Sequence, residues 1–413
     1  MIKPTWARGR KVLYLGLSLC LAAVTLSGCW DDRELDELGI VSGTAYDWED
    51  DQWRVTYQII NPSSTSSMGG SSGGSSISPP FLTFTERGST VTEAVARSNL
   101  TSTRQLFFSH SRISIINVKA VDQGLPALLD LFLRKPDESE TLFVFLSERE
   151  ASDVLEQLMQ VTKNQGMGIQ LMIQQESRLT SYYPGTRMFE LTMALSSDSH
   201  CATIPEIKLT KPAVMDKVED TQVTDLPSRI SLGRLGVLKE DRFVGWLNTK
   251  QAFGLTFLRN QINAASIPFS ADPKKEQNDS TFSLLKSKTV VKPVWDNDHF
   301  VMQVGIRGEG MLIETGGKAD LSKASELARL EKIIEEEVLE YVNAGWRAVQ
   351  GLNADVTEFA TLIHSKYPKR WKQIEEDNSW DQVFKEIEIR PSVSIDINRF
   401  GLSSKSYKSV EQN

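Results

Sequence analysis

The sequence predicts an α+β protein of two or three domains, each built from a mixed or antiparallel β-sheet flanked by helices. Runs that alternate apolar and polar side chains recur along the chain, and between them lie segments with apolar residues at helical spacing. A length of 413 residues with 40% hydrophobic residues is enough for more than one apolar core. Only Cys201 follows residue 29, so an intramolecular disulfide is not expected there.

The N-terminus resembles a bacterial lipoprotein signal. Four basic residues precede an apolar stretch over 12–26, which is shorter than the ~20 residues needed to span a bilayer. Small residues before Cys29 fit a signal-peptidase groove, and the Cys29 thiol can carry a lipid thioether. We expect residues 1–28 to be the signal peptide and Cys29 to be the lipidation site. The predicted lipobox consists of Leu26, Ser27, Gly28 and Cys29. The alternatives are an ordinary signal peptide with a cysteine at its cleavage site, or an uncleaved anchor.

The charge balance argues against nucleic acid as a partner. Removing the four basic residues of the signal leaves 42 basic and 54 acidic residues, a formal charge of −12. Nothing offsets repulsion by phosphates, and no basic run is interleaved with aromatic residues. Beyond the signal, no second segment is long and apolar enough to cross a membrane. The rest of the chain is therefore expected to be extracytoplasmic and tethered at one end to the bilayer.

The first predicted unit spans residues 29–200. Alternation and turn residues predict strands over 39–46, 53–60, 81–85, 112–118 and 141–146. Helical spacing predicts helices over 90–100 and 125–134, with Pro126 in the first turn of the latter, and a further helix from Ser152. The Ser/Gly-rich tract over 61–80 is expected to be a flexible loop that joins two paired strands, or alternatively a linker between domains. The pair Gly166 and Gly168 indicates a turn.

Residues 201–228 are expected to be a connection or a small middle region, 229–402 the second unit, and 403–413 a tail. Two hairpins are predicted, over 233–247 and 289–308. A long amphipathic helix follows over 322–349, and its Glu335–Glu337 run indicates a solvated face. Another helix is predicted to end before Pro368. The last strand, over 387–398, contains Pro391, which cannot donate to a ladder and so indicates an edge strand or a bulge.

The search for catalytic, cofactor-binding and metal-binding residues yields none. The four histidines lack metal-ligand spacing, and the adjacent pair His200–Cys201 points in different directions. Asp198, Ser199 and His200 supply triad residue types, but a triad is assembled across a fold rather than from neighbours. His110 can be a proton switch or a hydrogen-bonded structural histidine. Acidic residues are too numerous to single out a carboxylate pair. The residues therefore indicate a lipoprotein that is not an enzyme.

Several stretches occur in a characteristic order. They are 28–31, 34–35, 39–43, 104–116, 124–125, 134–137, 236–248, 353–355, 367–368, Trp371, Trp380, Phe384 and 399–401. In this order, and together with the lipobox, they resemble the Ger(x)C family, the lipoprotein C-subunits of bacterial spore germinant receptors. The resemblance covers roughly residues 28–402.

This resemblance implies a non-catalytic subunit on the outer face of the spore inner membrane. Its partners would be a polytopic A-subunit, a transporter-like B-subunit and the lipid bilayer, through Cys29. It implies no cofactor and no active-site residue beyond the lipidated cysteine. Two other classes stay open. A solute-binding lipoprotein of a transporter would need a ligand cleft, and a cell-wall hydrolase would need a defined catalytic pair.

Overall fold

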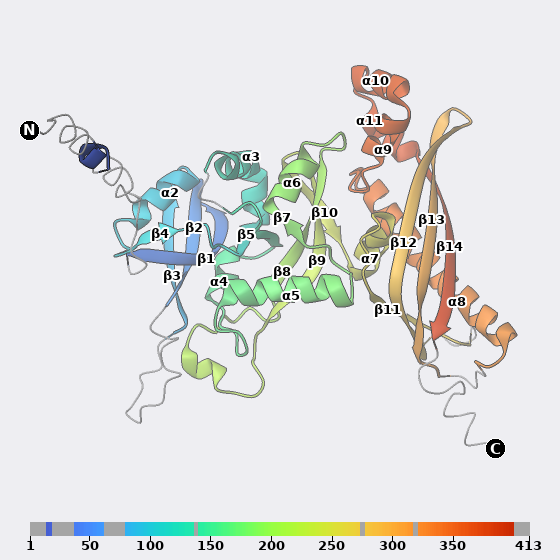
Figure 1. Ribbon diagram of the computed structural model, residues 1–413, viewed down its shortest axis with the longest axis horizontal. Helices are drawn as coiled ribbons and strands as arrows, with labels where there is room; N and C mark the ends of the chain where they lie inside the picture. The colour runs from blue at the N-terminus through green and yellow to red at the C-terminus, as the bar shows by residue number, and fades with distance from the viewer. Residues whose placement is uncertain are drawn as a thin grey trace, which may run out of the picture.

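The computed structural model describes residues 14–18, 37–61, 79–135, 139–272, 277–316 and 321–399. Two β-sheets, one of ten strands and one of four, lie side by side along the chain with helices against them (Figure 1). This arrangement confirms the predicted α+β class. The predicted lipobox, Leu26 to Cys29, lies outside the described residues. Among the helices of the described ranges, none combines the length and the apolar character needed to span a bilayer.

The ten-stranded sheet is mixed. Its strands are β1 (Leu38–Glu49), β2 (Gln52–Ile60), β3 (Phe81–Gly88), β4 (Gln105–Phe107), β5 (Ile113–Asn117), β6 (Phe143–Ser147), β7 (Thr186–Arg187), β8 (Cys201–Leu209), β9 (Ile230–Lys239) and β10 (Arg242–Leu247). The order is β10-β9-β8-β6-β5-β1-β2-β3, with β4 on β1 and β7 on β6. Strands β5, β6 and β8 are joined in parallel, whereas β2 pairs with β3 antiparallel. The 61–80 tract thus connects two paired strands, as predicted.

Helices cover both faces of this sheet, which explains why β5 and β6 are buried throughout. The helices are α2 (Val91–Ser98), α3 (Val118–Arg134), α4 (Ala151–Glu156), α5 (Gln165–Leu179) and α6 (Met188–Leu195). Figure 1 shows α3 and α6 above the sheet and α4 and α5 below it. One apolar cluster lies under α2, α3 and α6, and a second under α4 and α5.

Three glycines lie in helices at points of close packing. Gly166 and Gly168 lie in α5, not in a turn, since a Cβ at 166 would overlap the backbone carbonyl of Ser42. Helix α3 begins at Val118, before the predicted start, and its backbone is non-helical at Gly124. A Cβ there would overlap the Trp53 ring. A kink at a glycine thus separates the predicted helical segment from an additional first turn.

The expected connection over 201–228 is wrong in its first part. Residues 201–209 form β8, which is buried from Cys201 to Ile207 and pairs with both β6 and β9. The predicted hairpin over 233–247 exists as β9 and β10, but it extends the sheet of the first unit rather than opening the second. The physical reason is that β8, which is buried from Cys201 to Ile207, would otherwise be an unpaired edge. Only η3 (Val218–Thr221) interrupts the connection from β8 to β9.

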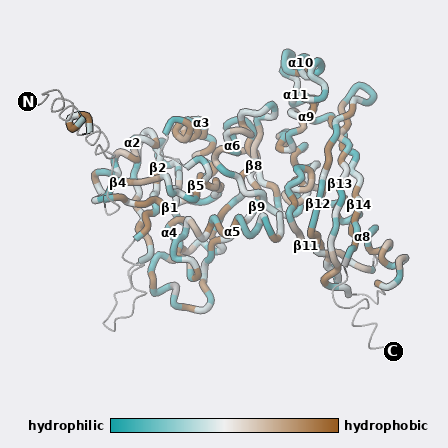
Figure 2. Tube along the Cα trace, in the orientation of Figure 1, coloured by the Kyte–Doolittle hydropathy of each residue, from teal (hydrophilic) through white to brown (hydrophobic). Residues whose placement is uncertain are grey.

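The second sheet has the order β11-β12-β13-β14, and β14 is an edge strand, as Pro391 predicted. The strands are β11 (Ala265–Phe269), β12 (Ser280–Asp296), β13 (His299–Glu314) and β14 (Glu388–Arg399). The helices are α7 (Thr249–Leu258), α8 (Ala324–Gly351), α9 (Phe359–Lys366), α10 (Pro368–Glu376) and α11 (Trp380–Glu386). The predicted long amphipathic helix is α8, whose buried stripe includes Leu330, Ile334, Val338 and Val342. Figure 2 shows α10 and the β12–β13 turn as mostly hydrophilic.

The expectation that Glu335 belongs to a solvated face is wrong. The Glu335 carboxylate accepts the backbone N–H of Ile395 at 3.0 Å, and Glu331, one turn earlier, accepts that of Ile397 at 3.0 Å. These amides belong to the free side of β14, because its other side pairs with β13. Two glutamates of α8 therefore satisfy donors of an edge strand that would otherwise be available to another chain.

Candidate functional site

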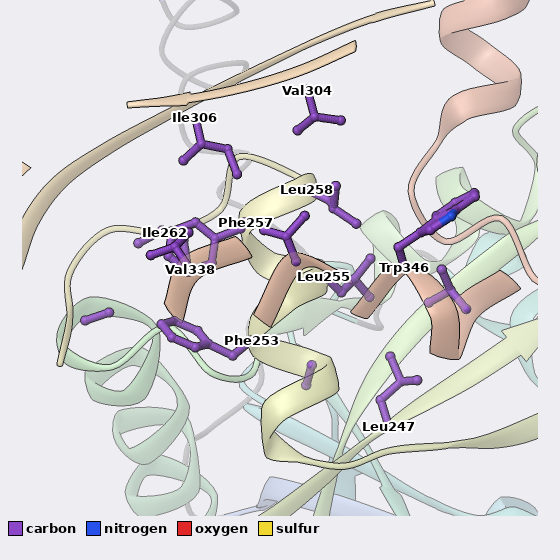
Figure 3. Packing of buried hydrophobic residues seen from close by; sticks show 14 of the residues in the cluster. Leu247, Phe253, Leu255, Phe257, Leu258, Ile262, Val304, Ile306, Val338 and Trp346 are labelled. Atoms are coloured by element: carbon purple, nitrogen blue, oxygen red, sulfur yellow. The ribbon is translucent and has the colours of Figure 1, made fainter. Parts of the chain in front are cut away.

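The candidate site is the junction between the two sheet units, where their cores merge. Helix α7 follows β10 directly, and the Asn248 side chain caps it. Figure 3 shows Val304 and Ile306 of β13 above α7, with Val338 and Trp346 of α8 flanking α7 to its left and right. The same apolar cluster reaches strands of the ten-stranded sheet. The two units thus share one core around α7.

Close contact between two helices sets the geometry of this core. A Cβ at Gly254 would overlap the backbone carbonyl oxygen of Tyr341, and one at Gly345 would lie 2.6 Å from the backbone nitrogen of Leu255. Both positions therefore need glycine for α7 and α8 to approach each other this closely. The small residues hold α7 in place between the ten-stranded sheet and α8.

Polar contacts reinforce the junction at its surface. Lys239, at the end of β9, donates from Nζ to Asp381 at 2.7 Å and to the carbonyl of Asn353 at 2.9 Å. Arg259, just after α7, donates to Thr203 at 3.1 Å and to Glu358 at 2.9 Å. Both cations therefore link the ten-stranded sheet, or the helix that follows it, to the helices that follow α8.

A third contact joins two residues that the sequence did not connect. Nδ1 of His364 in α9 lies 2.9 Å from the Asp198 carboxylate. The imidazole also stacks on the Trp371 ring, with centroids 5.4 Å apart and planes 15° apart. Asp198 lies in the segment 198–200, and its histidine partner is His364 rather than the neighbouring His200. No local pattern could have indicated a pair separated by 166 residues.

Three small cavities line the junction. One of about 370 Å³ lies beside α6 and includes Glu190, Thr203 and Arg259. A second of about 370 Å³ lies beside α10 and includes His200 and Trp380. The third, of about 310 Å³, adjoins Arg259 from the other side. Within the described ranges, no group of three or more His, Cys, Asp or Glu side chains is arranged to hold a metal ion.

Asp47 and Asp355 are buried carboxylates with backbone hydrogen-bond partners. Burial raises the pKa of Asp47 to about 6, although its carboxylate accepts the backbone N–H groups of Ala151 and Ser152. Burial also raises the pKa of Asp355, which accepts two backbone N–H groups at the start of α9. Both carboxylates thus hold the first turn of a helix. Burial raises the pKa of the Cys201 thiol to about 12, so this thiol is unreactive at neutral pH.

One buried ion pair crosses the ten-stranded sheet. Burial alone would raise the pKa of Glu206, but hydrogen bonds and charge from Arg234 lower it overall. The Glu206 side chain is 1% exposed, and the Arg234 guanidinium donates to it at 2.6 Å and 2.9 Å. Arg234 also lies over the Trp246 ring at 4.4 Å. The pair ties β8 to β9 next to the junction.

The remaining histidines are placed as follows. His110 lies exposed in a turn with its ring against Phe107, so it does not end a buried strand. His200 is exposed, whereas its neighbour Cys201 is buried, which agrees with side chains that point apart. His299 lies 3.7 Å from Glu388 at the turn between β12 and β13.

Comparison with known proteins relates nearly the entire chain to spore germination proteins. Residues 31–209 match the family described as "Spore germination protein N-terminal domain", and residues 234–401 match "Spore germination B3/ GerAC like, C-terminal". The chain is 25% identical to spore germination protein KC of Bacillus subtilis over 407 residues, which cover 97% of this chain and 98% of that protein. It is 23% identical to spore germination protein B3 of the same organism, covering 92% and 96%.

A solved structure shares the fold. The crystal structure of the GerBC protein superimposes with a TM-score of 0.55 and 20% identity, covering 89% of this chain and all of that chain. The two family matches lie in the expected order and together include both sheets described above. The chain therefore belongs to the Ger(x)C family of spore germination proteins.

Proposed function

We propose that this chain is the non-catalytic, lipid-anchored C-subunit of a spore nutrient germinant receptor. It would act at the outer face of the spore inner membrane, with a polytopic A-subunit and a transporter-like B-subunit as partners. One observation carries this proposal: both spore germination domains match in order, and full-length germination proteins align over nearly the entire chain. The role of the subunit is to assemble the complex or to couple its membrane subunits.

The architecture of the junction supports an assembly role. The two sheet units share one core around α7, and three polar links tie their surfaces together. The carboxylates at 47 and 355, whose pKa values burial raises, accept backbone N–H groups at the starts of helices, so a structural role accounts for their burial. A chain with two large sheets joined through one core offers extended surfaces to several partners at once.

The anchor proposal is tested at Cys29. Changing Cys29→Ala removes the thiol that carries the lipid, so we expect the chain to fold normally but to leave the membrane fraction and to lower germination. Cys201→Ala is the matched control, because that thiol is buried and lies far along the chain. Full membrane retention and normal lipidation of the Cys29→Ala chain would contradict the anchor.

The receptor role is tested by recovery of partners. The tagged chain is purified from detergent-solubilised spore membranes, and the proteins that accompany it are identified by mass spectrometry. We expect a polytopic subunit and a transporter-like subunit. Recovery alone, or with an ATP-driven transporter, would overturn the receptor role and favour a solute-binding lipoprotein instead.

A further inference from the structure

The side of the four-stranded sheet that faces away from α8 has an unusual charge pattern. Buried residues such as Val304 and Ile306 of β13 join the core with α8, so the residues between them point to the opposite side. We call this opposite side, formed by β12, β13 and β14, the outer face. In Figure 1, α8 runs along these three strands and leaves one side of the sheet uncovered by helices over most of its length.

Three adjacent rows cross the outer face. From the strand register they are Lys292–Gln303–Arg390, Val290–Gly305–Ser392 and Lys288–Arg307–Ser394. The rows contain four cations and no carboxylate, in a chain whose formal charge is −8. All four cationic side chains belong to exposed residues. The outer face is therefore a local positive patch on an acidic protein.

Two of these cations oppose each other directly. Lys288 of β12 pairs in register with Arg307 of β13, and like charges at such positions destabilise a sheet. Neither side chain, nor that of Lys292, makes an ion pair or hydrogen bond with any residue in the described ranges. Arg390 differs, because Glu388 and Asp296 lie 2.9 Å and 3.1 Å from it. Among the described residues, no carboxylate offsets the repulsion between Lys288 and Arg307.

The middle row leaves room for another chain. A Cβ at Gly305 would have only Val290 O at 3.9 Å and Ser392 Oγ at 4.0 Å as neighbours. Val290 is 46% exposed. A shallow strip of small side chains therefore lies between two cationic rows, which are roughly 13 Å apart because four residues separate them along the strand. A partner backbone can approach the strip while its acidic side chains reach both rows.

We propose that the outer face docks a carboxylate-bearing segment of a different protein, whose acidic groups neutralise Lys288, Arg307 and Lys292. This inference rests on the proposed function for the identity of that protein, a membrane subunit of the receptor. Opposite charges aligned across an interface select a partner and fix its register.

The neighbouring charges distinguish this occupant from two others. The next row, Lys286–Glu309–Asp396, places two carboxylates on the same face. A uniformly anionic bilayer would be repelled there, whereas a protein segment can present a cation at that point. A second copy of this chain carries the same net negative charge, so long-range electrostatics disfavour its approach. A distinct acidic protein segment satisfies both conditions.

The test reverses the opposed pair. Lys288→Glu with Arg307→Glu keeps two like charges opposite each other, so the cross-strand repulsion in the folded chain is similar and the chain is expected to fold. The control reverses Lys163 and Lys217 to Glu, two exposed cations of the first unit without ion pairs in the described ranges. Partner recovery from solubilised spore membranes should fall about tenfold or more for the first variant and stay within about twofold for the control.

A single substitution separates docking from folding. Lys288→Glu places a carboxylate opposite Arg307 and creates a favourable cross-strand pair, so the Tm of the purified chain should rise while partner recovery falls. A purely structural role would move both quantities in the same direction and would overturn the inference.

The remaining outcomes are also decisive. If the unmodified chain recovers no membrane subunit, the proposed function fails. If it recovers one and the Lys288→Glu, Arg307→Glu chain recovers it equally well, the docking face is wrong. A bilayer role would appear as binding of the purified Cys29→Ala chain to anionic lipid vesicles that the Lys288→Glu, Arg307→Glu change abolishes while partner recovery stays unchanged, and it would also overturn the inference.

Discussion

The glutamates that cover the free side of β14 make a quantitative prediction about the edge of the second sheet. Changing Glu331 and Glu335 together to Ala removes two acceptors, each 3.0 Å from a backbone N–H of the strand. Hydrogen bonds to a charged group contribute about 1.5–3 kcal/mol each, but water can reach an edge and replace part of that. We therefore expect the double variant to lose about 2 kcal/mol of unfolding free energy.

Hydrogen exchange localises this effect. A loss of about 2 kcal/mol in local stability corresponds to roughly 30-fold faster exchange at the amides of Ile395 and Ile397, provided that exchange occurs through local opening. Amides on the side of β14 that pairs with β13 should change less. The uncovered edge is also a template for another strand, so size-exclusion chromatography should show concentration-dependent association of the variant.

Two controls isolate the cause. Glu336→Ala alters an exposed residue of the same helix and tests helix propensity alone. Glu335→Gln keeps an oxygen acceptor without charge and should lose less than Glu335→Ala. If the double Ala variant matched Glu336→Ala in stability and left exchange at residues 395 and 397 unchanged, the edge-covering role would be refuted.

Three further predictions concern the interior. Burial raises the pKa of Asp47 from 3.8 to about 6, so between these values the folded chain keeps a proton there that the unfolded chain has released. Urea unfolding should therefore show the wild type losing about 2 kcal/mol relative to Asp47→Asn as pH rises from 4 to 7, and parallel pH profiles would contradict this. Arg234→Met leaves the buried Glu206 carboxylate without its guanidinium, so the free energy of unfolding in urea should fall by about 3 kcal/mol. Adding Glu206→Gln should restore part of this loss, and an unchanged urea midpoint for Arg234→Met would exclude a stabilising pair. Gly254→Ala places a methyl group against the backbone of α8 and should lower the free energy of unfolding by about 1–3 kcal/mol. Gly351→Ala, which has open space around it, should not lower it. Equal thermal midpoints for the two variants would mean that α7 and α8 tolerate a wider spacing.

Much of the secondary structure is readable from the sequence because its signals are local. The spacing of apolar residues in α8, the turn between β9 and β10, and Pro391 in the last strand each depend on residues near one another in the chain. The pairing of β2 with β3 across residues 61–80 follows from two similar strands and a polar tract between them. The order of family motifs likewise identified the Ger(x)C family, which the comparisons confirmed.

The boundary between the units could not be read in this way. The hairpin of β9 and β10 has the same local pattern whether it opens a new sheet or extends an old one. The structure places it beside β8 because the buried strand β8 would otherwise present an unpaired edge. Which edge a hairpin meets depends on the rest of the fold, and no periodicity within the hairpin encodes it.

The candidate site likewise combines features that the sequence predicted with features that only the tertiary structure decided. The sequence by itself indicated the family and many of the strands and helices, although it missed β8 and the start of α5. Only the tertiary structure paired Asp198 with His364, turned Glu331 and Glu335 toward an edge strand, and aligned Lys288 opposite Arg307. Sequence patterns report which side of an element faces the core, because burial repeats with the period of that element. They do not report which polar groups meet across a surface, since those meetings depend on how distant segments pack.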